Sequence, residues 1–358
     1  MSLEALNSPP LIGILTAGCY CALPFVVNNP LFSRLPWSTI KGMNILAYGI
    51  SIYSVTRPGR YDSQQSTSSP SSSKQASELK NKKKNDDVDV DVVDDIGNEF
   101  QDGNNRSLLN PAGYAFSIWG IIFIGELIMV STPYIIISPP PTSTQLIIRE
   151  ITGPYMMSQL FQILWCASFR PKYNRLSSAV GGSGLYKYLS VFNLTGIAVS
   201  LSFCHDAFTT NNKSDVSSSY SNMNYWCYFL PLTLHFGWTT AASLVNLNGM
   251  YAMRSPTSTK SVAVLGNFSV IIATTIGITV TYIRNAPVYG GVISWALTAV
   301  SFGLKKRLSL LLDNKYDKND KNKVGMYGAK TQQTLCQIGA IACAMTSAFV
   351  VAFSGRGN

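Results

Sequence analysis

The feature of this 358-residue chain that most restricts its fold is a series of long apolar segments with almost no charge. A helix needs roughly 20 apolar residues to cross a hydrocarbon core of about 30 Å. The candidate spans are 11–27, 112–137, 154–169, 188–204, 228–250, 262–283, 288–304 and 336–353. A soluble helical protein would carry polar residues along one face of each helix, and these segments do not. We therefore expect an all-α, polytopic integral membrane helical bundle with about eight transmembrane helices, or nine if 42–56 also crosses.

The mean hydropathy of +0.15 hides these segments, because the polar residues are concentrated in one part of the chain. There, a Ser-rich stretch (QQSTSSPSSSK) is followed by a basic run (KNKKK) and an acidic run (DDVDVDVVDD). Such a composition cannot bury enough apolar surface to offset the entropy lost on ordering. The sequence therefore predicts a disordered insertion at 57–107.

Lys and Arg residues alternate between the loops. The loops that follow 154–169, 228–250 and 288–304 contain fourteen of them, and the alternate loops with the C-terminus contain four. Basic loops face the cytosol or its equivalent. The net charge of +10 is therefore explained without a nucleic-acid partner, and the basic loops favour an anionic lipid surface. The expected partners are membrane lipids and a hydrophobic small molecule, with a homodimer left open, and the sequence does not indicate an organelle.

These patterns divide the chain into six segments. They are N-terminal membrane span or spans at 1–56, the insertion at 57–107, a helical bundle at 108–250, additional membrane helices at 251–304, a basic cytosolic-side loop at 305–335 and a C-terminal membrane helix at 336–358.

One apolar segment, LNPAGYAFSIWGIIFIGELIMV at 109–130, contains an acid. Four of its side chains are spaced by three, four and three residues and so share one helix face: Phe116, Trp119, Phe123 and Glu126. Glu126 is the only acid in any of the expected spans, and a carboxylate at the bilayer centre costs on the order of 2.5 kcal/mol or more. We expect Glu126 to face the bundle, where it either accepts a hydrogen bond or carries a proton.

Two later spans repeat this combination of a tryptophan and a polar group on one face. The first face carries Ser158, Gln162, Trp165 and Phe169, and the second carries His235, Trp238, Ala242 and Asn246. Such tryptophans can simply be packing residues, since aromatic side chains dominate helix contacts. Three of them on polar-bearing faces instead favour a shared interior pocket. The side chains that we expect to bind a ligand are Phe116, Trp119, Phe123, Glu126, Gln162, Trp165, His235, Trp238 and Asn246, and the expected hydrogen-bond partner of Glu126 is Gln162, His235 or Asn246.

These motifs resemble those of the tryptophan-rich sensory protein/translocator protein (TspO/MBR) family, and most closely its longer members. The motifs that carry the resemblance are NPAGYAFSIWG, Gln162-x-x-Trp165, Trp238-x3-Ala242-x3-Asn246 and SWAL at 294–297. Two departures are visible: Gln162 stands where the family has Asn, and Pro231 lies seven residues before Trp238, whereas in the short members the spacing is four. The short members have five helices, so the spans after 250 are additional to a TspO-like core.

The resemblance implies a helical bundle whose cavity binds hydrophobic or amphipathic small molecules; porphyrins and sterols are associated with the short members. We therefore expect an integral membrane protein that binds, transports or senses a hydrophobic or tetrapyrrole-like molecule in a Trp-lined cavity. No cofactor is certain, and a porphyrin or sterol-like ligand is the candidate. His235 could ligate the iron of a tetrapyrrole, although a lone histidine is more often a core hydrogen-bond donor.

Two alternatives remain open. One is a structural or assembly subunit of a larger membrane complex, for which the long insertion and the basic loops would serve as docking elements. The other is a secondary transporter of a small metabolite, which would need an inverted repeat and broken helices with paired charges. The chain has no phosphate loop, no HExxH and no nucleophile elbow. We therefore expect no enzyme, no catalytic residue and no metal site.

Overall fold

The computed structural model describes residues 8–27, 29–58, 60, 106–135, 142–170, 173, 185–211, 224–253, 258–312 and 328–354. The predicted disordered insertion at 57–107 lies almost entirely outside these residues. It therefore stays a prediction.

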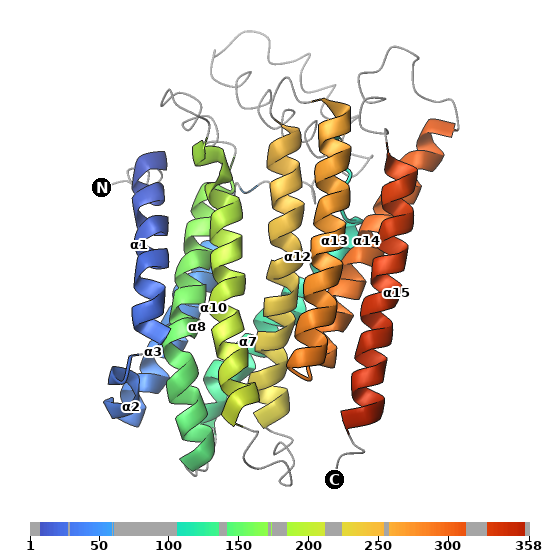
Figure 1. Cartoon of the computed structure of the whole chain (residues 1–358). Helices are drawn as coiled ribbons and strands as arrows, with labels where there is room; N and C mark the ends of the chain where they lie inside the picture. The colour runs from blue at the N-terminus through green and yellow to red at the C-terminus, as the bar shows by residue number, and fades with distance from the viewer. Residues whose placement is uncertain are drawn as a thin grey trace, which may run out of the picture.

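Long helices that run side by side make up the bundle (Figure 1). Within the described residues they are α1 (Pro9–Val27), α3 (Trp37–Thr56), α7 (Ile118–Ile135), α8 (Thr142–Ser168), α10 (Leu189–Asn211), α12 (Leu230–Ala252), α13 (Thr259–Ile283), α14 (Pro287–Leu312) and α15 (Ala329–Ser354). Short helical turns precede or link them: α2 (Leu31–Arg34), η2 (Gly113–Ser117), η3 (Leu185–Tyr188) and η5 (Tyr225–Phe229). No strand occurs in the described part of the chain. The predicted all-α bundle is confirmed.

Six of these helices are long and apolar enough to cross a membrane: α1, α7 with η2, α10 with η3, α13, α14 and α15. The other long helices, α3, α8 and α12, carry more polar side chains. In α12 these side chains are buried, as at His235 and Asn246, because they point into the bundle and not toward lipid. A helical membrane bundle is therefore supported, and the predicted number of eight or nine crossings stays a prediction.

Helix α8 begins earlier than the sequence predicts. It starts at Thr142, whereas the predicted span starts at 154. The additional turns contain Arg149, whose guanidinium donates to the backbone carbonyls of Phe32, Ser33 and Leu35 at α2. This contact gives the charged side chain hydrogen-bond acceptors beyond the apolar part of the helix.

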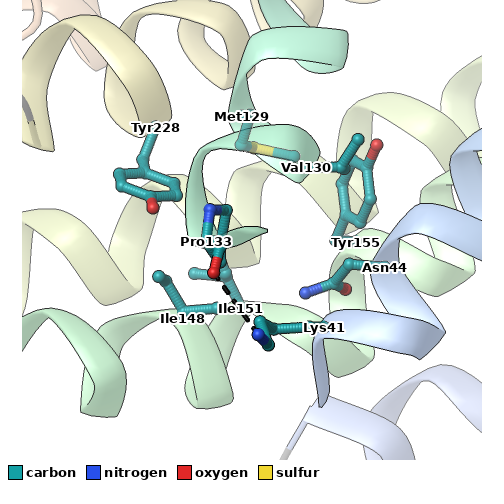
Figure 2. A pocket seen from close by; sticks show the side chains of 9 residues that line it. All are labelled: Lys41, Asn44, Met129, Val130, Pro133, Ile148, Ile151, Tyr155 and Tyr228. Carbon is teal, nitrogen blue, oxygen red and sulfur yellow. Dashed lines mark hydrogen bonds between the residues drawn. The ribbon is translucent and has the colours of Figure 1, made fainter. Parts of the chain in front are cut away.

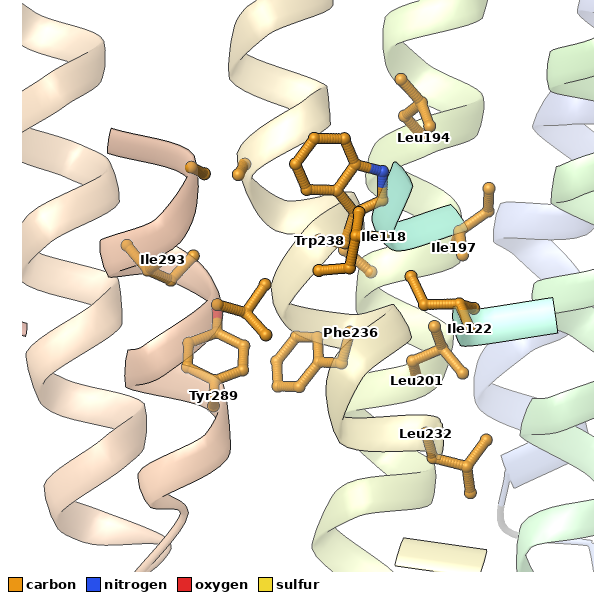
Figure 3. Packing of buried hydrophobic residues seen from close by; sticks show 14 of the residues in the cluster. Ile118, Ile122, Leu194, Ile197, Leu201, Leu232, Phe236, Trp238, Tyr289 and Ile293 are labelled. Atoms are coloured by element: carbon orange, nitrogen blue, oxygen red, sulfur yellow. The ribbon is translucent and has the colours of Figure 1, made fainter. Parts of the chain in front are cut away.

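Helix α12 lies at the centre of the bundle and packs against α7, α10, α13 and α14. Figure 3 shows Phe236 and Trp238 of α12 between Ile122 of α7 and Ile197 of α10 on one side and Tyr289 of α14 on the other. The ring centroids of Phe236 and Tyr289 are 4.5 Å apart. Side chains on several faces of α12 are therefore fixed by neighbouring helices.

The last three helices pack through small residues. Gly277 of α13 lies so close to Cys343 of α15 that an added Cβ would be 2.8 Å from its sulfur atom. An added Cβ at Gly339 of α15 would lie even closer to the Thr274 hydroxyl oxygen, and the Ser294 hydroxyl donates to the Ala340 carbonyl over 2.8 Å. Small residues let membrane helices approach closely, and α13, α14 and α15 are joined in this way.

The residues that lead into α7 are held against α14. The Ala112 N–H donates to the Ala299 carbonyl over 2.9 Å. The rings of Tyr114 and Trp295 meet edge to face with centroids 5.1 Å apart. Gly303 leaves room for the Asn110 carbonyl, which would lie 2.6 Å from an added Cβ. Two motifs that are far apart in the sequence, NPAGYAFSIWG and SWAL, therefore contact each other and fix the start of α7.

Candidate functional site

The three tryptophans predicted to share a pocket come together from α7, α8 and α12. Trp119 and Trp165 stack with ring centroids 5.8 Å apart and an interplanar angle of 22°. Trp119 and Trp238 meet edge to face at 6.2 Å. We call these three side chains the tryptophan cluster. Trp165 and Trp238 are buried, and Trp119 is half-buried.

Phenylalanines extend the tryptophan cluster. Phe123 stacks on Trp119 and Phe169 stacks on Trp165, each with ring centroids 5.3 Å apart. Phe116 meets Trp238 edge to face at 5.9 Å. All three phenylalanines are half-buried, so this row of rings reaches the outer surface of the bundle. The site therefore offers large, nearly parallel aromatic faces.

Glu126 faces the interior of the bundle and is 1% exposed. Its Oε1 atom lies 2.6 Å from Nδ1 of His235, which is also buried. Its Oε2 atom accepts hydrogen bonds from Gln159 Nε2 over 3.2 Å and from the Tyr155 hydroxyl over 3.4 Å. The acid therefore has a polar neighbour at each carboxyl oxygen.

Of the three partners expected for Glu126, the structure brings only His235 to the carboxyl group. Gln162 is fully buried, but no described residue pairs with either atom of its amide group. Asn246 bonds to α10 instead, where its Oδ1 atom accepts from the Ser190 hydroxyl over 3.2 Å. The expectation that Glu126 pairs with one of these three residues is therefore met by His235.

Tyr155 and Gln159 are the partners that the sequence analysis missed. They lie on α8 at positions i and i+4, and Gln162 follows at i+7, so the three share one face. Ser158, chosen from the sequence as part of the polar face, bonds to the Tyr155 carbonyl within its own helix. The spacing of Tyr155, Gln159 and Gln162 was the signal that could have identified this face.

The groups that contact the Glu126 carboxyl oxygens can all act as hydrogen-bond donors. The Gln159 amide and the Tyr155 hydroxyl both donate to it, and His235 Nδ1 donates as well when the ring is protonated there. A carboxylate beside an imidazolium has no net charge, so this pair is less costly in the bundle interior than a lone carboxylate. Glu126 and His235 therefore form a coupled polar pair beneath the tryptophan cluster.

Several buried polar atoms of the predicted site have no hydrogen-bond partner among the described residues. They are the indole N–H groups of Trp165 and Trp238, both amide atoms of Gln162, and Nε2 of His235. His235 contacts Trp119 directly, with ring centroids 5.7 Å apart. Buried polar groups are normally paired, and each one left unpaired costs about 1–3 kcal/mol. An indole N–H can only donate, so this site is rich in free donors.

The fold and this site define a multi-pass membrane protein with a tryptophan-rich interior. A model of the family described as TSPO-like protein matches residues 95–312. Because this region is more than half of the chain, the protein belongs to the TSPO-like protein family. Comparison with curated proteins and with solved structures gave no match.

The family assignment confirms an integral multi-pass membrane protein related to TspO/MBR. The matched region contains the tryptophan cluster and both motifs that meet at the start of α7. It also continues beyond the predicted bundle boundary at 250 to the end of α14. Helices α13 and α14 are therefore part of the matched family region, and α15 lies after it.

Proposed function

We propose that this protein binds a hydrophobic, tetrapyrrole-like small molecule at the tryptophan cluster and acts as a binding protein and not as an enzyme. The observation that carries the proposal is the set of unpaired buried donors among stacked aromatic rings. Aromatic faces suit a flat apolar ligand, and free N–H groups need acceptors. The ligand class that satisfies both is a planar hydrophobic molecule with carboxylate or carbonyl oxygens.

The row of rings also suggests a route by which such a ligand enters from the bilayer. Phe123 and Phe169 are half-buried at the ends of the row, whereas Trp165 and Trp238 are buried behind them. A molecule dissolved in the bilayer would meet the phenylalanines first and the indole N–H groups after insertion. Transport and sensing both begin with this binding step.

The test is native mass spectrometry of the full-length protein with protoporphyrin IX, together with quenching of tryptophan fluorescence to measure affinity. We expect one ligand per chain. Trp119→Ala should weaken binding roughly tenfold, because it removes the ring that contacts both other tryptophans. Trp226→Ala is the matched control, since Trp226 is 62% exposed on η5.

Absence of any complex would contradict the proposal and favour a structural subunit or a transporter of a small metabolite. Equal loss of affinity in both variants would contradict the location of the site.

A further inference from the structure

A small cavity lies between α3, α7, α8 and η5 (Figure 2). Its volume is about 10 Å³, which is close to the space that one water molecule requires. Lys41 of α3 lies at its edge and donates to the Pro133 carbonyl over 3.4 Å. Tyr155 of α8 and Tyr228 of η5 form further parts of the wall. The cavity is therefore small and partly polar.

The cavity follows the same face of α7 as Glu126. Met129, Val130 and Pro133 line it and lie three, four and seven residues after Glu126. Tyr155 belongs to both places, because its ring lines the cavity and its hydroxyl donates to Glu126 Oε2 over 3.4 Å. One tyrosine thus connects the cavity with the buried acid.

The cavity also offers hydrogen-bonding groups for a water molecule. The Asn44 amide donates to the Thr152 hydroxyl over 3.1 Å, but no described residue pairs with its buried Oδ1 atom. Pro133 lacks an N–H, so the Met129 carbonyl four residues earlier has no helical donor. The Lys41 ammonium group is a further donor beside the same space. A buried water is stable where it has two to four such partners.

We propose that Glu126 and His235 form a proton-binding site, and that Tyr155 and the cavity connect it to the membrane face at which α7 ends. This inference rests on the proposed function in one respect: proton uptake at this pair accompanies binding of an acidic ligand at the tryptophan cluster. His235 makes the link, because Nδ1 faces Glu126 and the same ring contacts Trp119.

The proton step balances at each atom. Tyr155 gives its hydroxyl proton to Glu126 Oε2 while its oxygen takes a proton from a water in the cavity. That water takes a proton in turn from the aqueous phase at the face where α7 ends, so no hydroxide remains. With Glu126 protonated, His235 can stay an imidazolium whose Nε2–H donates to a ligand carboxylate. The pair carries no net charge before binding, and the pair with the ligand carboxylate carries none after it, so one proton enters with each acidic group held at this position.

The other titratable groups close to Glu126 do not replace Tyr155 in this path. Tyr48 of α3 and Cys204 of α10 both lie within electrostatic range of the acid. The Tyr48 hydroxyl donates to the Phe123 carbonyl over 2.8 Å, and the Cys204 thiol donates to the Ile151 carbonyl over 3.7 Å. Their protons are directed to backbone oxygens. Lys41 is the charged group of the cavity itself.

The first experiment does not depend on any ligand. Infrared difference spectra of the reconstituted full-length protein are recorded across pH for wild type and Glu126→Gln. We expect a carbonyl band of a protonated carboxylic acid that grows as pH falls and is missing in Glu126→Gln. If no pH-dependent band distinguishes the two proteins, the proton-binding site is excluded, whether or not protoporphyrin IX binds.

The second experiment measures the affinity for protoporphyrin IX as a function of pH. Uptake of one proton predicts an affinity that falls about tenfold per pH unit in wild type. His235→Gln keeps a donor for Glu126 but removes the imidazolium that would hold the ligand carboxylate, so the slope should disappear. An equal slope in both proteins would overturn the coupling while leaving the proposed function intact.

The third experiment tests the route. The protein is placed in vesicles with a separate pH on each side, and protoporphyrin IX fluorescence follows its binding after a pH jump. We expect a response to pH on the face where α7 ends, slowed in Tyr155→Phe. Tyr289→Phe is the matched control, because it removes a buried hydroxyl that donates to Thr240 and not to Glu126. Equal rates in wild type and Tyr155→Phe would contradict the route.

Discussion

Two parts of this bundle differ in the residues through which their helices pack. Helices α7, α8 and α12 meet through aromatic rings and long polar side chains, and several of the polar atoms have no partner among the described residues. Helices α13, α14 and α15 meet at glycines, where atoms of the neighbouring helix occupy the space that a side chain would fill. Glycine contacts leave little to rearrange, whereas aromatic rings can move apart to admit a flat molecule. This difference supports placing the proposed ligand site in the first part and the more rigid packing in the second.

Gln332 of α15 is an exception within the second part. It is fully buried against Gly266 of α13, and no described residue pairs with either of its amide atoms. A single amide between glycine-packed helices does not resemble the tryptophan cluster. A substitution of Gln332 therefore tests whether this part of the bundle contributes to ligand binding.

The largest loss of stability is expected for Glu126→Ala. Removal of the carboxylate leaves the His235, Gln159 and Tyr155 donors buried without an acceptor, which should cost about 3–5 kcal/mol of stability. Thermal unfolding in detergent measures this loss. Glu126→Gln keeps the size and one acceptor and should lose much less. Similar unfolding temperatures for wild type and the alanine variant would show that the polar pair does not stabilise the first part of the bundle.

A smaller loss of stability is expected for Gly290→Ala in α14. A Cβ at this position would collide with the hydroxyl groups of Ser347 and Thr281, so we expect a cost of about 1–3 kcal/mol. The neighbouring Gly291→Ala is the control, because nothing lies within 4 Å of its added Cβ. Protoporphyrin IX affinity should be unchanged in both. A weaker affinity in Gly290→Ala would break the division between a binding part and a rigid part.

Trp238→Phe should weaken ligand binding without loss of stability. The change keeps an aromatic ring but removes an N–H that has no partner among the described residues. Loss of one ligand hydrogen bond of about 0.5–1.5 kcal/mol lowers the affinity by roughly two- to tenfold. Fluorescence titration gives the affinity and thermal unfolding gives the stability. A stability loss with unchanged affinity would make Trp238 a packing residue.

The smallest change in stability and in ligand affinity is expected for Gln332→Met. Methionine has a similar volume and removes both unpaired amide atoms, so stability should change by less than about 1 kcal/mol. Ligand affinity should not change. A clear loss of affinity would extend the binding region into the glycine-packed helices.

Most of the helices could be predicted, because an apolar run of sufficient length has few alternatives in a membrane. The start of α8 could not, since Arg149 interrupts the apolar pattern and is satisfied by carbonyls of α2 that are far away in the sequence. The pairing of Glu126 with His235 was among the predicted contacts, because helical spacing places both on tryptophan-bearing faces. Gln159 was not predicted, because the predicted face ran through the neighbouring Ser158, and both residues are buried; only the i, i+4, i+7 spacing of Tyr155, Gln159 and Gln162 indicated the face that reaches Glu126.

The most direct test of ligand binding by the tryptophan cluster compares protoporphyrin IX with its dimethyl ester, which has the same ring system without the acidic groups. Affinities are measured for wild type and for the double variant Trp165→Phe/Trp238→Phe, which keeps both rings and removes both indole N–H groups. We expect wild type to prefer the acid by about tenfold, as charge-assisted hydrogen bonds of about 1.5–3 kcal/mol require. The double variant should lose most of this preference. An equal preference in both proteins, or none in wild type, would contradict the assignment of the unpaired indole groups to a ligand.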